Sequence, residues 1–115
     1  MQTAVLTHTG LVRQKNEDDY LLLPEIQFFA VADGMGGHQA GAFASNLALK
    51  IISEKLSFFN KKVDPLGFLT QIVQEANGRI YHLGCTEEDK KGMGTTFTSL
   101  WINKGVAYLA HVGDS

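Results

Sequence analysis

The amino-acid sequence predicts an α+β fold with strands near both ends of the chain and two consecutive helices between them. Short runs of β-forming residues before residue 33 and after residue 94 predict the strands, while apolar residues at helical spacing predict the helices. Because strands and helices are segregated along the chain, we expect the helix pair to lie on one face of a sheet.

The first part of the chain predicts three strands separated by polar segments. Residues 2–8 are rich in β-forming side chains, residues 9–19 form a polar loop of mixed charge, and residues 21–23 are a strand that Pro24 ends. Residues 26–32 are apolar at nearly every position. Such a run predicts a strand that is covered on both faces.

Two helices and a hairpin follow. Apolar residues recur at helical spacing from residue 41 to residue 59, and Asp64 with the proline after it predicts the capped start of a second helix. Residues 95–102 and 106–112 then predict two strands that are joined by a tight turn at residues 103–105.

Composition limits the classes of protein to which the chain can belong. Of its 115 residues 44% are hydrophobic and 19% are charged, which is typical of a globular domain, and a net charge of −2 predicts neither nucleic acid nor membrane as a partner. Cys85 is the only cysteine and no signal peptide follows Met1, so we expect a cytoplasmic protein. Because the sequence stops directly after an apolar strand, we expect a truncated domain.

Acidic residues occur at three places where a predicted strand meets a loop. Asp33 follows the apolar strand and precedes glycines, so its carboxylate and a neighbouring backbone carbonyl could hold a hard cation such as Mg²⁺ or Mn²⁺. The alternative is a turn aspartate that caps the next helix. Arg13 could bind phosphate while Glu17 and Asp18 hold metal, or all three could simply be solvated. The third place is Asp114, which follows the last strand.

Other polar features allow more than one interpretation. His38 could be a proton donor or a surface residue at a helix start, His111 is interpreted as a hydrogen-bonded core residue, and residues 92–96 as the flexible start of a strand. A cysteine phosphatase is excluded because Lys91 stands where Cys-x5-Arg requires arginine, and a nucleotide-binding loop is disfavoured because Gln39 replaces its third glycine.

Four motifs, in this order along the chain, resemble those of the PPM (PP2C-like) family of metal-dependent serine/threonine protein phosphatases, bacterial type. They are residues 13–18 (Arg-Gln-Lys-Asn-Glu-Asp), 32–38 (Ala-Asp-Gly-Met-Gly-Gly-His), 92–96 (Gly-Met-Gly-Thr-Thr) and 111–115 (His-Val-Gly-Asp-Ser). The resemblance covers almost the whole chain and implies an αββα sandwich. Residues 1–115 would be the N-terminal half of a single catalytic domain, with two helices and strands from both sheets.

The resemblance also implies a metal site. Asp33 would bridge two Mn²⁺ or Mg²⁺ ions, and the Gly34 carbonyl would bind one of them. Asp18 would contact the metals through water with Glu17 beside it, and Asp114 would bind a third, weaker metal.

The reaction that the resemblance implies is hydrolysis of phosphoserine and phosphothreonine in proteins by a metal-activated water, opposite a serine/threonine kinase. Arg13 would hold the substrate phosphate, and His38 would be a candidate acid for the leaving group. The alternative is a non-catalytic module that binds phosphoproteins or a regulatory partner. With the C-terminal half absent, we expect this chain alone to bind metal poorly, to be inactive and to associate with itself through exposed strand edges and apolar faces.

Overall fold

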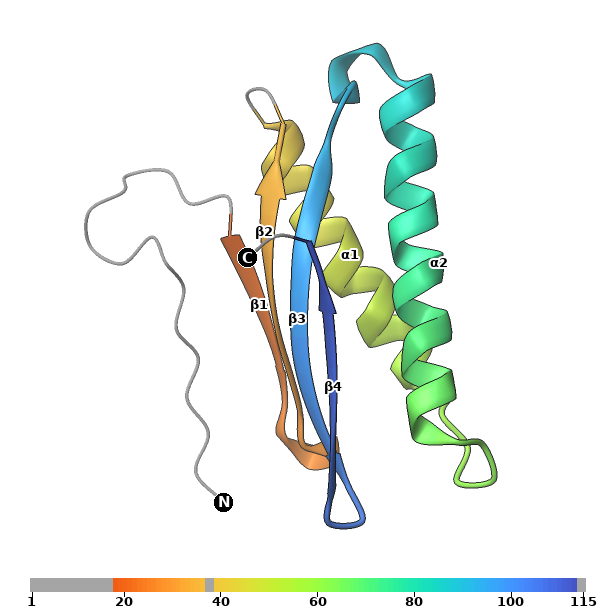
Figure 1. Cartoon of the computed structure of the whole chain (residues 1–115). Coiled ribbons are helices and arrows are strands. Elements are labelled where there is room, and N and C mark those ends of the chain that lie inside the picture. Colours follow the sequence, from red (N-terminus) through yellow and green to blue (C-terminus); the bar gives the residue numbers. More distant parts are fainter. Residues whose placement is uncertain (1–17, 37–38, 114–115) are drawn as a thin grey trace, which may run out of the picture.

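The computed structural model describes residues 18–36 and 39–113 (Figure 1). In chain order the elements are β1 (Asp18–Leu23), 3-10 helix η1 (Pro24–Ile26), β2 (Phe28–Met35), α1 (Ala40–Leu56), α2 (Pro65–Thr86), 3-10 helix η2 (Glu88–Lys90), β3 (Gly94–Asn103) and β4 (Val106–Val112). The four strands form one antiparallel sheet in the order β1-β2-β3-β4. Both helices cover the same face of this sheet (Figure 1), which confirms the predicted α+β arrangement.

The described strands all belong to one sheet, whereas the sequence predicted strands from both sheets of a sandwich. Two antiparallel pairs, β1–β2 and β3–β4, are each formed by strands close in sequence. The two helices connect β2 to β3 and place these strands side by side, so the two pairs merge. The strand predicted at residues 2–8 lies outside the described residues.

β2 is longer than predicted, and the described residues cover only one of its faces. Phe28, Ala30 and Ala32 point toward the helices and are buried, whereas Asp33 and Met35 are exposed. The prediction of a strand covered on both faces is therefore wrong for the described part of the chain. The reason is that both helices pack on the same side of the sheet.

The starts and ends of the helices have local causes. The Asp64 carboxylate accepts a 3.0 Å hydrogen bond from the Gly67 N–H group, so it caps α2 as predicted. α1 ends at Leu56 rather than at residue 59. Phe59 leaves the helix and packs edge-on against Trp101, with ring centroids 4.8 Å apart.

The turn between β3 and β4 also matches its prediction. Lys104 and Gly105 both have positive φ angles, 53° and 79°. Two residues of this kind at the centre of a hairpin give the turn a twist that matches the strands on either side.

The core lies between the sheet and the helix pair. Its largest fully buried side chains include Trp101, Phe28, Ile52 and Leu69. The Trp101 indole N–H donates to the backbone oxygen of Ile26 at 3.2 Å, which satisfies its polar group inside the core.

The opposite face of the sheet carries an apolar row that no described residue covers. Leu22, Phe29, Leu100 and Leu109 are successive cross-strand partners in the sheet register. Leu22 is 42% exposed and Leu109 is 69% exposed, values far above those of core residues. We call these four residues the apolar row.

Among the described helices, none is long and apolar enough to cross a membrane.

Candidate metal site

Parts of the four motifs meet at one end of the sheet. Asp18 is the Cα register partner of Asp33, and Asp33 is the partner of Thr96. Gly113 follows the end of β4 and lies against Thr96. In Figure 1 this is the upper end of the sheet, next to the label of the C-terminus. Segments that are far apart in sequence thus lie in one row across the strands.

Asp33 lies within β2, not in a loop after the strand as predicted. Within the described part of the chain its carboxylate is exposed and makes no hydrogen bond or ion pair, while its backbone oxygen lies 3.5 Å from the Thr96 hydroxyl. The N-cap of α1 is Gln39, with no side-chain capping bond. The alternative interpretation of Asp33 as a helix cap is therefore wrong.

Gly34 has a packing role that the sequence did not indicate. Its Cα faces α1, and a Cβ at this position would lie 1.7 Å from the Gly41 carbonyl oxygen. Gly36 is constrained by its backbone, with φ +144°, and a Cβ there would lie 3.1 Å from the Ala40 Cβ. These two glycines let the end of β2 lie close against the first turn of α1.

The glycines of the third motif lie beside those of the second. In the register of β2 and β3, Gly94 is the partner of Met35 and Thr95 is the partner of Gly34. Gly92 lies two residues before β3 and has a φ of +77°, a conformation that favours glycine. The sequence suggested only flexibility for this segment, because which strand it pairs with is not visible in its own residues.

The donor atoms at this end of the sheet fit a hard divalent cation, but only as part of a site. A free carboxylate and neighbouring backbone oxygens are the ligand types that Mg²⁺ and Mn²⁺ prefer. Within residues 18–36 and 39–113, however, no three His, Cys, Asp or Glu side chains come close enough to share a metal. The described residues therefore supply part of a metal shell and do not complete it.

Several predicted site residues lie outside the described residues: Arg13, Glu17, His38 and Asp114. The backbone of Asp18 is described and its pairing with Asp33 is clear, but its side chain is not. The roles that the sequence predicts for these residues stay predictions.

His111 is hydrogen-bonded, as predicted, but it is not a core residue. It is exposed on the uncovered face of the sheet, where its Nδ1 lies 2.7 Å from the Thr98 hydroxyl oxygen. Its Nε2 lies 3.2 Å from the Gly113 backbone oxygen. Sequence reasoning missed Thr98, whose only signal is its position in the alternation of β3.

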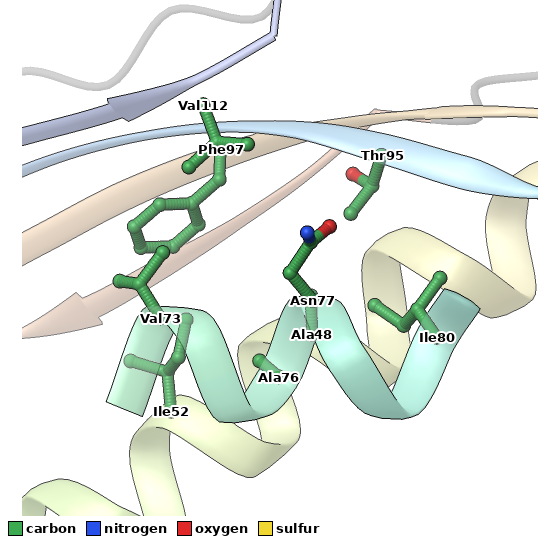
Figure 2. A pocket seen from close by; sticks show the side chains of 9 residues that line it. All are labelled: Ala48, Ile52, Val73, Ala76, Asn77, Ile80, Thr95, Phe97 and Val112. Atoms are coloured by element: carbon green, nitrogen blue, oxygen red, sulfur yellow. The ribbon is translucent and has the colours of Figure 1, made fainter. Parts of the chain in front are cut away.

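A small apolar pocket, with room for about one water molecule, lies between α1, α2 and the sheet near the end of β4 (Figure 2). It is lined by Ala48, Ile52, Val73, Ala76, Asn77, Ile80, Thr95, Phe97 and Val112. Only Asn77 and Thr95 in this lining have polar side chains, and none is charged. The cavity therefore does not suit a phosphate group or a metal ion.

A family model supports the motif-based resemblance. The model of the protein phosphatase 2C family matches residues 8–115. This chain belongs to the protein phosphatase 2C family. The predicted resemblance to PPM (PP2C-like) phosphatases is thereby confirmed.

Individual relatives agree with this membership. The serine/threonine protein phosphatase PstP of Mycobacterium tuberculosis is 36% identical over 115 residues, which are 100% of this chain and 22% of PstP. Protein phosphatase PhpP of Streptococcus pneumoniae is 32% identical over 122 residues, covering 100% of this chain and 48% of PhpP.

A solved structure of the family confirms the fold. The catalytic domain of the serine/threonine protein phosphatase PstP, crystallised with two manganese ions, superposes with a TM-score of 0.78 at 37% identity. The superposition covers 92% of this chain and 45% of that domain. The chain therefore spans less than half of the length of PstP, of its crystallised catalytic domain and of PhpP.

Proposed function

We propose that this chain is the N-terminal half of a single catalytic domain, and that the complete domain removes phosphate from phosphoserine and phosphothreonine in proteins. The observation that carries the proposal is the cross-strand pairing of Asp18 with Asp33, because it brings two acidic motifs to one end of the sheet. The family membership supports the reaction, and the manganese ions of PstP support Mn²⁺ or Mg²⁺ as the cofactor.

The chain would contribute oxygen ligands to this reaction. Two divalent cations, when bound, would lower the pKa of a water molecule and neutralise the charge of the phosphate. The exposed Asp33 carboxylate and the Gly34 carbonyl would hold the cations from β2. Asp18 would act from β1 through water, with Glu17 beside it, and Asp114 would bind a third cation.

The remaining roles concern the substrate. The Arg13 guanidinium would hold the phosphate with two parallel hydrogen bonds, a geometry that lysine cannot offer. His38 would donate a proton to the serine or threonine oxygen as it leaves. The partners would be phosphoproteins of a serine/threonine kinase pathway.

The test is phosphate release from a phosphothreonine peptide with Mn²⁺, measured on the longest product of the gene and on the 115-residue chain. We expect the longer product to be active, Asp33→Asn to abolish its activity, and Asp19→Asn to leave it intact. Asp19 is a matched control because it lies on the neighbouring strand one residue from Asp18, with its carboxylate accepting from the Tyr20 N–H.

The result also decides between catalysis and the alternative function. If the gene encodes nothing beyond Ser115, or if the longer product releases no phosphate, the catalytic proposal fails. A phosphoprotein-binding module would then be the better explanation of the same motifs. Binding of the phosphothreonine peptide without turnover would support that module.

A further inference from the structure

Thr98 and His111 form a hydrogen-bonded pair that the proposed reaction does not use. The two residues are register partners on β3 and β4, and Thr98 Oγ1 lies 2.7 Å from His111 Nδ1. The other ring nitrogen, Nε2, lies 3.2 Å from the backbone oxygen of Gly113. The imidazole ring therefore links β3 to the peptide group that leaves β4.

The atoms around the ring determine the direction of both hydrogen bonds. A carbonyl oxygen can only accept, so Nε2 carries a proton and donates it to the Gly113 oxygen. In the neutral ring Nδ1 is then an acceptor, and the Thr98 hydroxyl donates to it. Each hydrogen bond polarises the ring in the direction that strengthens the other.

Gly113 also lies close to Thr96 of β3. Its φ is +109°, a conformation that side chains rarely adopt, and a Cβ there would lie 2.6 Å from the Thr96 Cγ2 atom and 3.2 Å from the Thr96 Cα. Thr96 is the register partner of Asp33, so only β3 separates Gly113 from the strand that carries the candidate metal ligand. Gly113 therefore contacts His111 of its own strand and lies beside Thr96 of β3.

We propose that His111 is a positioning residue, which together with Thr98 fixes the Gly113 peptide group and so the direction of the chain beside the Asp33 end of the sheet. Because a peptide group is planar, a held Gly113 oxygen also fixes the plane of the peptide bond that follows Gly113. The importance of this for metal binding rests on the proposed function; the hydrogen bonds themselves need no metal.

The first experiment observes the hydrogen bonds directly by NMR on the 115-residue chain without metal. We expect His111 to be protonated on Nε2 and not on Nδ1. The Gly113 carbonyl ¹³C resonance should shift in His111→Leu and Thr98→Val and stay near its original position in His111→Gln and Thr98→Ser. Gln retains an N–H group that reaches the Gly113 oxygen, and Ser retains the hydroxyl donor. A ring that carries its proton on Nδ1 and none on Nε2 overturns the proposal. An unmoved Gly113 resonance in both His111→Leu and Thr98→Val, the two loss variants, also overturns it.

The second experiment titrates the same variants with Mg²⁺ and follows the amide resonances of β2, a method suited to weak binding. Substitution of a residue that orients a metal ligand typically weakens metal binding by about 10-fold or more. His111→Leu and Thr98→Val should therefore bind Mg²⁺ about 10-fold more weakly than the unsubstituted chain. His111→Gln and Thr98→Ser should bind it as the unsubstituted chain does. Asp33→Asn serves as the ligand variant. If Asp33→Asn weakens binding and the loss variants do not, the positioning role is wrong and the proposed site stands. If Asp33→Asn changes nothing, both are wrong.

Discussion

Gly34 of β2 and Gly41 of α1 approach each other so closely that a Cβ on Gly34 would fall 1.7 Å from the Gly41 oxygen and 2.4 Å from its carbonyl carbon. Both of these atoms belong to the backbone of a helix, so neither can rotate away as the end of a side chain would. The contact sets the distance between α1 and the strand that carries Asp33. Glycine at position 34 is therefore required by packing, whatever its carbonyl binds.

We expect Gly34→Ala to lower the free energy of unfolding by about 3 kcal/mol, because the added methyl group must push α1 away from β2. Urea unfolding at low protein concentration measures the change. Gly78→Ala is the matched control, since a Cβ there meets no atom within 4 Å and alanine is the better helix former by about 1 kcal/mol. Equal effects of the two substitutions would contradict the packing role of Gly34.

Ser99→Ala should raise the stability of the chain by about 1 kcal/mol. The Ser99 hydroxyl is buried on β3 and has no hydrogen-bond partner among the described residues, and such a group costs about 1–3 kcal/mol to desolvate. The midpoint of thermal unfolding measures the gain. Ser45→Ala is the control, because this equally buried hydroxyl donates to the Ala42 oxygen at 3.2 Å. A loss of stability in Ser99→Ala would reveal a partner for the hydroxyl.

The 115-residue chain alone should bind Mn²⁺ with an affinity much weaker than micromolar. Asp33 is the one predicted ligand whose side chain the structure describes, and no group of three metal-binding side chains forms within residues 18–36 and 39–113. Isothermal calorimetry gives the affinity. Asp33→Asn should remove the residual binding, and Asp19→Asn should not. A micromolar dissociation constant for the unsubstituted chain would show that more ligands are present than we predict.

The chain should associate with itself through the apolar row and through the edges of the sheet at β1 and β4, with which no further described strand pairs. Burying one leucine contributes about 1.5–3 kcal/mol, and the row presents Leu22, Phe29, Leu100 and Leu109 together on one uncovered face. We expect light scattering at high concentration to give a mass above that of a monomer, and Leu109→Lys to lower it.

The control for this prediction is Phe58→Lys. Phe58 is 76% exposed, even more than Leu109 at 69%, but it follows α1 and is not part of the sheet. Its substitution should leave the association unchanged. A sharp monomer mass for the unsubstituted chain, or an equal effect of both lysine variants, would show that the apolar row is not the contact.

Much of the fold follows from local patterns in the sequence. The cap at Asp64 and the turn at Lys104 depend on residues that are neighbours in the chain, so their physics is visible in the sequence. The end of α1 was mispredicted, because Phe59 continues the helical pattern but packs against Trp101, a residue far away in sequence. Contacts of this kind compete with local preference and cannot be read from spacing.

The candidate site, like the fold, was only partly predictable from the sequence. The residue types at Asp33 and Gly34 led to the prediction of oxygen ligands, His111 was predicted to be a hydrogen-bonded core residue, and four motifs were enough to indicate the family. Only the tertiary structure shows that Asp33 lies inside a strand. It also shows that His111 forms a hydrogen bond with Thr98 on the face of the sheet opposite the helices.

The sequence by itself therefore determined the order and approximate positions of the described helices and strands, and which chemical groups the chain carries. The tertiary structure decided which of them meet: Asp18 with Asp33, Asp33 with Thr96, and Gly34 with Gly41. The physical reason is the register of the sheet, which depends on the packing of both helices against it. A shift of one residue would turn every side chain of a strand to the other face. In β2, where residues 28–32 are all apolar, the pattern of the strand itself does not exclude that shift.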